Sequence, residues 1–207
     1  MRGAPALYLV TDRTASALPL PEALAAALSK IDPTRVAVQL REKDLKPREL
    51  FALGRAALEA CRARDVPLLL NDRLDVALAL GADGVHLGGD SMSAADARRV
   101  WPGALIGVSC HSPEELCERA PGADFAVWGP VFPTPSKARY GPPVGTFRLP
   151  EALAVGLPLV ALGGVDEANA KGLRAQGFRG IACIRAVFSA QDPGAAAARL
   201  LSAFQAA

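Results

Sequence analysis

The chain has 207 residues, of which 51% are hydrophobic and 21% are charged, and its formal net charge is +2. This length and composition predict a single globular domain over residues 1–207 with a substantial core, and they exclude a disordered chain. The basic residues are scattered, and aromatic residues make up only 5% of the chain. We therefore expect no nucleic-acid-binding surface and no membrane-binding face.

The cysteines argue against a zinc cluster and against a disulfide framework. Cys61, Cys110, Cys117 and Cys183 form no Cys-x-x-Cys pair and no cluster with the two histidines. We expect reduced thiols and a cytoplasmic protein. The first residues lead into a strand-like run rather than a signal peptide, and no apolar segment is long enough to span a membrane. The sequence leaves open whether copies of the chain form a homo-oligomer.

Short apolar runs alternate along the chain with longer stretches of helical periodicity. The runs predict strands at residues 7–10, 36–41, 68–70, 84–88, 105–110, 125–128, 159–162 and 180–184. Helices are predicted at 21–30, 47–64, 74–80, 93–100, from 112 onwards, and at 148–155, 166–176 and 193–205. Because the strands are almost continuously apolar, they belong to a parallel sheet that is covered on both faces.

Eight such strand–helix units in this length predict a (β/α)8 TIM barrel. An open doubly wound sheet is the competing fold, and it often carries a glycine-rich turn after its first strand. Thr11-Asp12-Arg13 stands at that place here, which favours the barrel.

In a barrel, polar residues at the carboxyl ends of all strands meet at one mouth, where active sites lie. Gln39 and Arg41 share one face of their strand, and a buried Gln and Arg need polar partners that a bound anion would supply. Taken alone, residues 41–43 also fit a solvated loop of mixed charge. The candidates at the mouth are Gln39, Arg41, Lys43, Asn71, Asp72, His86, Asp90, Ser91, Ser109, Thr134, Ser136, Lys137, Gly163, Gly164, Ile184 and Arg185.

The loop 129–137 follows the sixth strand and is stiffened by prolines. It presents the hydroxyl groups of Thr134 and Ser136 and the ammonium group of Lys137. These groups suit a phosphate or pyrophosphate. A proline-rich surface turn with a solvated lysine is the alternative.

Two further strand ends point to anion chemistry. Asp72, with Asp90 on the neighbouring unit, would hold Mg2+ together with phosphate oxygens, although Asp72 also suits the N-cap of the helix at 74–80. Gly163-Gly164 before a capped helix would cradle a phosphate, or it is a tight turn. His86 is a candidate base, but a hydrogen-bonded core histidine is the commoner outcome.

Two phosphate sites predict two phosphorylated small-molecule substrates. With Mg2+ and cations gathered on a diphosphate, the expected chemistry is departure of pyrophosphate from an activated carbon.

These residues carry a resemblance to a known family. The segments that carry it are Leu9-Val10-Thr11-Asp12, Gln39-Leu40-Arg41-Glu42-Lys43, Asn71-Asp72-Arg73, Gly84-Val85-His86-Leu87-Gly88, Gly107-Val108-Ser109, the 129–137 loop and Ala161-Leu162-Gly163-Gly164-Val165. Together they resemble thiamine phosphate synthase and its relative, the thiazole tautomerase. The resemblance implies a (β/α)8 barrel. It also implies a transferase that joins 4-amino-5-hydroxymethyl-2-methylpyrimidine diphosphate to a thiazole phosphate, with loss of pyrophosphate.

The resemblance also implies roles for individual residues. Asp72 would bind Mg2+, with Asp90 as the candidate second ligand. Arg41, Lys137 and Ser109 would be catalytic. The pyrimidine diphosphate would be held by Gln39, Arg41, Lys43, Asn71, Ser109 and Lys137, and the thiazole phosphate by Thr134, Ser136, Gly164 and the backbone of Ile184 and Arg185.

This chain departs from the synthase pattern at two positions. The synthase pattern His-x-Gly-Gln-x-Asp begins at His86 in this chain, and its last residue is the second metal ligand. Ser91 stands at that position, and Asp90 comes one residue early. Arg185 stands where the synthases usually carry Ser. The tautomerases carry a catalytic His where this chain has Pro130. A thiazole tautomerase and a non-catalytic regulator that binds thiazole or thiamine phosphate remain the alternatives.

Overall fold

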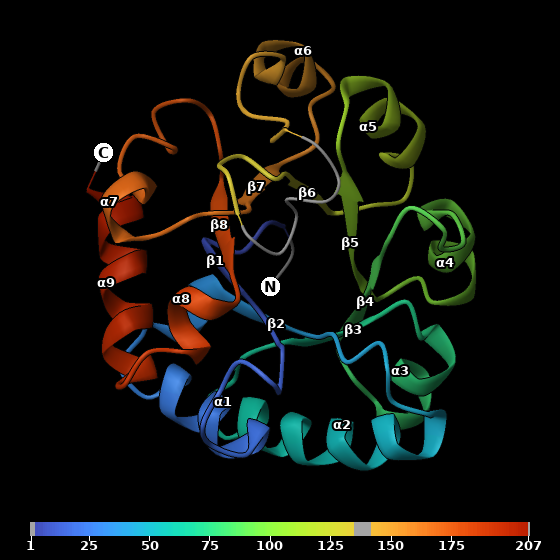
Figure 1. Cartoon of the computed structure of the whole chain (residues 1–207). Helices are drawn as coiled ribbons and strands as arrows, with labels where there is room; N and C mark the ends of the chain where they lie inside the picture. The colour runs from blue at the N-terminus through green and yellow to red at the C-terminus, as the bar shows by residue number, and fades with distance from the viewer. Residues whose placement is uncertain (1–2, 135–141, 207) are drawn as a thin grey trace.

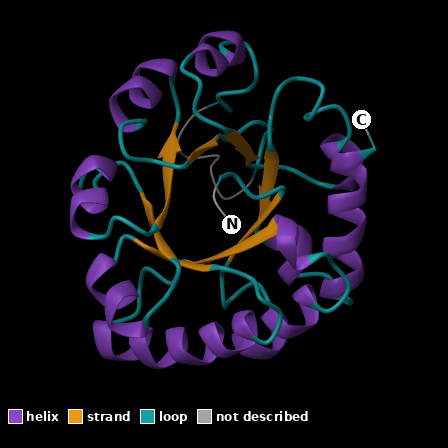
Figure 2. Ribbon diagram, turned by 180° about the vertical axis from the view of Figure 1, so that it is seen from behind, coloured by secondary structure: helices purple, strands orange, loops and turns teal. Residues whose placement is uncertain are grey.

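The computed structural model describes residues 3–134 and 142–206. Eight parallel strands pair in chain order, and the last pairs with the first, so the sheet closes into a barrel. Figure 2 shows this ring of strands with the helices outside it. The (β/α)8 barrel predicted from the sequence is confirmed.

The strands are short and almost wholly buried. Their bounds are β1 Leu7–Val10, β2 Val36–Leu40, β3 Leu68–Asn71, β4 Gly84–Leu87, β5 Leu105–Cys110, β6 Phe125–Trp128, β7 Leu159–Leu162 and β8 Gly180–Cys183. They lie within one or two residues of the predicted runs because each run is apolar enough to be covered on both faces.

The helices form the outer layer. Their bounds are α1 Leu20–Leu28, α2 Pro47–Arg62, α3 Leu74–Leu80, α4 Ala94–Val100, α5 Pro113–Arg119, α6 Leu149–Ala154, α7 Glu167–Ala170, α8 Arg185–Phe188 and α9 Pro193–Gln205, and a 3-10 turn η1 covers Pro33–Arg35. The last helix, α9, packs beside α1 and joins the two ends of the outer ring (Figure 1).

The structure corrects two predictions after the seventh and eighth strands. The helix predicted at 166–176 ends at Ala170, because Lys171 is extended and Gly172 has φ +94°, a left-handed conformation that interrupts a helix. The strand predicted to Ile184 ends at Cys183, and a four-residue helix, α8, that the sequence analysis did not predict begins at Arg185. Both errors lie in short segments where periodicity carries little information.

The apolar residues divide into two cores. The larger lies between the barrel and the helices and includes Leu7, Leu24 and Phe204. The smaller fills the barrel itself, where Tyr8 and Phe125 pack with aliphatic side chains from the other strands. The interior of the barrel is therefore filled by side chains, and a small molecule can bind only at its ends.

A glycine allows β4 and β5 to approach closely where β4 begins. A Cβ atom on Gly84 would lie 1.9 Å from the backbone oxygen of Leu105 on the next strand. A backbone atom in a closed barrel cannot move aside without disturbing the neighbouring pairs.

We therefore expect Gly84→Ala to lower the free energy of unfolding by about 2 to 3 kcal/mol, because the added methyl group overpacks the β4–β5 pair. Gly103→Ala is the matched control, since its Cβ would meet nothing within 4 Å. Urea unfolding of the parent and both variants measures the difference. Equal midpoints for Gly84→Ala and the parent would contradict this account of the barrel.

Candidate functional site

Polar side chains occupy the interior positions at the carboxyl ends of four strands. Because side chains alternate along a strand, Gln39 follows Ala37 into the barrel, and Asn71 follows Leu69 in the same way. Asn71 is level with His86 in the β3–β4 pair, and Ser109 lies one interior position beyond Gly107, the residue paired with His86. The structure thus brings together the predicted residues Gln39, Asn71 and Ser109 at one mouth.

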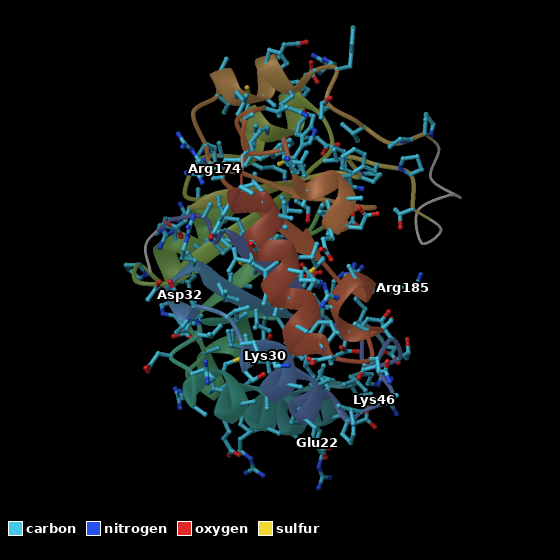
Figure 3. All side chains as sticks on the ribbon, turned by 90° about the vertical axis from the view of Figure 1, so that its left-hand side faces the viewer. Glu22, Lys30, Asp32, Lys46, Arg174 and Arg185 are labelled. Carbon is cyan, nitrogen blue, oxygen red and sulfur yellow. The ribbon has the colours of Figure 1, made fainter. Side chains whose placement is uncertain are left out.

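Figure 3 shows the direction of the barrel from its labelled side chains. Lys46, which follows β2, and Arg185, which follows β8, lie toward one end. Asp32, which precedes β2, and Arg174, which precedes β8, lie toward the other. The residues that follow the strands therefore share one end of the molecule, as the sequence analysis predicted.

Four of the interior side chains form a hydrogen-bonded row. Gln39 Nε2 donates to the Tyr8 hydroxyl at 3.2 Å, and this hydroxyl lies 3.3 Å from His86 Nδ1. His86 Nε2 in turn lies 2.9 Å from Ser109 Oγ. The row spans strands β2, β1, β4 and β5, so it links two predicted substrate contacts through two buried aromatic rings. Tyr8 was missed because it lies at the middle of an apolar run rather than at a strand end.

The row lies in a dry environment. Burial, aided by the positive charges of Arg41 and Arg119, lowers the pKa of His86 to about 3. Burial also raises the pKa of Tyr8, although its hydrogen bond with Gln39 acts in the opposite direction. Both rings are therefore uncharged at neutral pH. His86 is the hydrogen-bonded core histidine that the sequence analysis gave as the commoner outcome.

Gly107 provides the space for the imidazole ring. A Cβ atom there would lie 2.7 Å from His86 Nδ1 and 2.6 Å from the ring of Phe125. The glycine in the Gly107-Val108-Ser109 segment is thus a packing requirement of the polar row.

A buried carboxylate fixes the loop after β2. Glu42 is 6% exposed, and its Oε1 accepts from Thr11 Oγ1 at 2.7 Å and from the backbone N–H of Arg13. Arg13 adds an ion pair to Glu42 at 3.0 Å. Thr11 Oγ1 also accepts from the backbone N–H of Arg41. The alternative of a freely solvated 41–43 loop is therefore wrong for Glu42, because its charge is paired inside the loop.

This cluster positions the two predicted cations of the loop. Arg41 is half-buried at the mouth, and Lys43 is exposed. On the outer side, Arg13 also holds Asp44, and their hydrogen bonds lower the pKa of Asp44 to about 2. No sequence pattern assigns a role to Glu42 or Arg13, since a charged residue in a loop of mixed charge gives no sign that it is buried.

Asp72 follows β3 and has a positive φ of 66°. Its Oδ1 accepts a hydrogen bond from Ser91 Oγ. Asp72 does not cap α3: the N-cap residue is Arg73, which makes no side-chain capping bond. The N-cap alternative is therefore wrong. Ser91 lies against Asp72, as its register in the family pattern implies, and Asp90 is exposed beside it.

Arg119, at the end of α5, holds the loop that carries Asp90 and Ser91. Its guanidinium group donates to the backbone oxygens of Leu87, Gly88 and Gly89. Arg119 Nε is buried, and it has no hydrogen-bond partner among the described residues. This contact joins α5 to the end of β4, and nothing in the sequence spacing identifies it.

The loop after β6 runs beside the glycines that follow β7. The backbone N–H groups of Val131 and Phe132 donate to the oxygens of Leu162 and Gly163 at 2.8 and 3.0 Å. Gly164 has φ +64°, and a Cβ there would lie 2.6 Å from the Pro133 oxygen. The predicted contact Gly164 thus touches the residue before Thr134, another predicted contact.

The remaining predicted residues are placed less tightly. Ile184 is half-buried at the N-cap of α8, and Arg185 is exposed in its first turn. Asp166 accepts from two backbone N–H groups of α7, so it occupies the start of that helix. Ser136 and Lys137 lie outside the described residues.

For Mg2+, the described residues offer a half-site. Residues 3–134 and 142–206 contain no group of three or more His, Cys, Asp or Glu side chains that would hold a metal ion. Mg2+ is commonly bound through one or two carboxylates, with substrate phosphates and water as the other ligands. Asp72, with a hydroxyl neighbour and Arg41 at the same mouth, fits that pattern when a diphosphate is bound.

The buried cysteines are poorly suited to act as catalytic nucleophiles. All four are free, and burial raises the pKa of Cys61, Cys110 and Cys183 to about 12. A thiol with so high a pKa is a poor nucleophile.

Among the helices of the described residues, none has the length and apolar character to cross a membrane.

Comparison with known proteins places the chain in a family. The sequence model of the family described as thiamine monophosphate synthase matches residues 7–187. The chain belongs to this family. A protein of Geobacter sulfurreducens is 46% identical over 199 residues, which cover 95% of this chain and 92% of that protein. The thiamine-phosphate synthase of Roseiflexus castenholzii is 44% identical over 194 residues, which cover 92% of this chain and 84% of that protein.

The family's fold is also found among solved structures. The thiamine phosphate pyrophosphorylase of Pyrococcus furiosus superposes with a TM-score of 0.87 at 34% identity, covering 99% of this chain and 98% of that one. The resemblance to the thiamine phosphate synthase family inferred from the sequence is confirmed, and the polar mouth described above is the mouth of a barrel of that family.

We expect Glu42→Gln to lower the free energy of unfolding by about 1 to 3 kcal/mol, because it places an amide donor in the buried cluster and removes the buried partner of Arg13. Asp44→Asn is the control, since it removes an exposed partner of the same arginine and should change stability within measurement error. Thermal and urea unfolding check both values. Equal losses in the two variants would show that Glu42 does not hold the loop.

Proposed function

We propose that this chain is a thiamine phosphate synthase. It would join 4-amino-5-hydroxymethyl-2-methylpyrimidine diphosphate to a thiazole phosphate and release pyrophosphate. The observation that carries the proposal is the polar mouth of a barrel of this family, in which Gln39 and Arg41 from the end of β2 and Ser109 from the end of β5 converge.

The pyrimidine diphosphate would bind over the interior row. Gln39 and Ser109 supply amide and hydroxyl groups at the bottom of the mouth, and Asn71 stands level with His86. Arg41 and Lys43 follow the same strand and would hold the diphosphate, helped by Lys137. Cationic groups in a partly dry site interact strongly with a diphosphate.

The thiazole phosphate would bind at the opposite side of the mouth. Thr134 and Gly164 come from loops that pair with each other. The backbone of Ile184 and Arg185, and Ser136, would complete this site. Arg185 adds a positive charge that is exposed near it.

Asp72 would hold Mg2+ against the diphosphate. When bound, the ion would neutralise charge on the departing pyrophosphate. The hydrogen bond from Ser91 orients one carboxylate oxygen of Asp72. This contact supports Ser91, rather than Asp90, as the neighbour of the ion. Because a hydroxyl group is uncharged, such a metal site would carry less negative charge than a pair of carboxylates.

The reaction then needs little from the protein beyond placement and charge. The bond between the pyrimidine methylene carbon and the diphosphate oxygen breaks, and its electron pair leaves with pyrophosphate. The thiazole nitrogen lone pair forms the new bond to that carbon. Arg41 and Lys137 would stabilise the leaving group, and Ser109 would hold the pyrimidine while it carries positive charge.

The test is to mix the purified protein with both substrates and Mg2+ and to measure pyrophosphate and thiamine phosphate. We expect equal amounts of the two products, and no release when either substrate is omitted. Aromatisation of a thiazole carboxylate phosphate without pyrophosphate release would instead support a tautomerase. Tight binding of thiamine phosphate without any turnover would support a regulator.

The metal site gives a second prediction. Ser91→Asp should lower the Mg2+ concentration needed for half-maximal turnover by about tenfold, because it adds a second carboxylate beside Asp72. Asp72→Asn should raise that concentration by a similar factor. Turnover measured against Mg2+ concentration after chelation checks both.

Asp90→Ala is the matched control for this pair of variants. Asp90 is exposed and lies next to Ser91, so its removal should leave the magnesium requirement unchanged. A rise equal to that of Asp72→Asn would show that Asp90 is the second ligand.

A further inference from the structure

Tyr8 lies at the centre of the interior polar row, although the proposed reaction gives it no role. It is fully buried on β1, and its ring packs edge-on against Phe125 with centroids 5.2 Å apart. The hydroxyl lies between Gln39 Nε2 and His86 Nδ1, and these two polar partners fix its position. A tyrosine held so firmly between two polar partners can impose a direction on their hydrogen bonds.

The direction follows from counting hydrogens. A hydroxyl group has one hydrogen to donate. Gln39 Nε2 can only donate, so the Tyr8 oxygen accepts there and its own hydrogen goes to His86 Nδ1, the other polar atom in contact. Because both ring contacts of His86 are uncharged hydroxyl groups and the ring is buried, the imidazole is neutral. Its proton must then be on Nε2.

The consequence reaches the mouth of the barrel. His86 Nε2–H donates to Ser109 Oγ across 2.9 Å. Ser109 accepts that bond and keeps its own hydrogen for another partner. Ser109 is half-buried and lies at the end of the row nearest the mouth, so a bound substrate is the partner it can reach.

We propose that Tyr8 is a positioning residue, which acts through His86 to fix Ser109 as a hydrogen-bond donor to the pyrimidine substrate. This inference rests on the proposed function, in which Ser109 contacts that substrate. The atom that Ser109 meets must then be an acceptor. The Gln39 amide oxygen, which accepts no hydrogen bond from residues 3–134 and 142–206, offers the complementary acceptor for a donor group.

The opposite arrangement is a definite alternative. With the Gln39 amide turned so that its oxygen faces Tyr8, every bond in the row reverses and His86 carries its proton on Nδ1. Ser109 would then donate to His86 and only accept from a substrate. The position of one proton therefore distinguishes the two arrangements.

The first experiment locates that proton directly. Nitrogen NMR of protein labelled with 15N-histidine shows which ring nitrogen carries hydrogen. The chain has two histidines, so His111→Gln identifies the signals of His86. We expect the proton on Nε2 in the substrate-free protein. A proton on Nδ1 would overturn the proposal.

The second experiment removes the hydroxyl group. In Tyr8→Phe we expect His86 to show both tautomers, since nothing then selects between them. KM for the pyrimidine diphosphate should rise about tenfold, the size of one ordinary hydrogen bond, with KM for the thiazole phosphate unchanged. A single unchanged tautomer, or an equal rise in both KM values, would overturn the positioning role.

Phe125→Leu is the control, because it removes the ring contact and keeps the Tyr8 hydroxyl group. It should retain the Nε2 proton. If Tyr8→Phe does not fold, the nitrogen spectrum of the parent still decides the direction. A parent that releases no pyrophosphate contradicts the proposed function alone, and an active parent with the proton on Nδ1 contradicts this inference alone.

Discussion

The hydrogen-bonded row inside the barrel is the constraint on which the site depends. A barrel interior must be filled, and any polar group placed in it must find a partner there. Tyr8 and His86 form a hydrogen bond with each other. Tyr8 also bonds to Gln39, and His86 also bonds to Ser109, at the mouth. The same side chains therefore fill the core and hold the polar groups at the mouth in place.

The loops at the mouth are held by a second set of buried contacts. Glu42 is paired with Thr11 and Arg13, so the β2 loop is anchored to the end of β1. Arg119 anchors the β4 loop from the following helix. In each case a charged side chain is held within the scaffold, and no carboxylate among the described residues forms an ion pair with Arg41 at the mouth. The proposed binding of a diphosphate would benefit from this separation.

Two parts of the mouth correspond to the two proposed substrates. The interior row and the β2 loop form one side, and the paired loops after β6 and β7 form the other. Asp72 and Ser91 lie after β3 and β4. A single rim thus carries the proposed metal ligand and both proposed anion-binding regions, as a reaction that joins two phosphorylated molecules would require.

The sequence by itself determined the barrel, its strands and the set of strand-end residues, because apolar runs and their polar ends are local patterns. It also carried the likeness to the family. Only the tertiary structure decided the partners: Tyr8 with His86, Glu42 with Arg13, and Ser91 with Asp72. Each of these pairs joins different strand–helix units, and spacing along one chain does not say which side chains meet across a closed sheet.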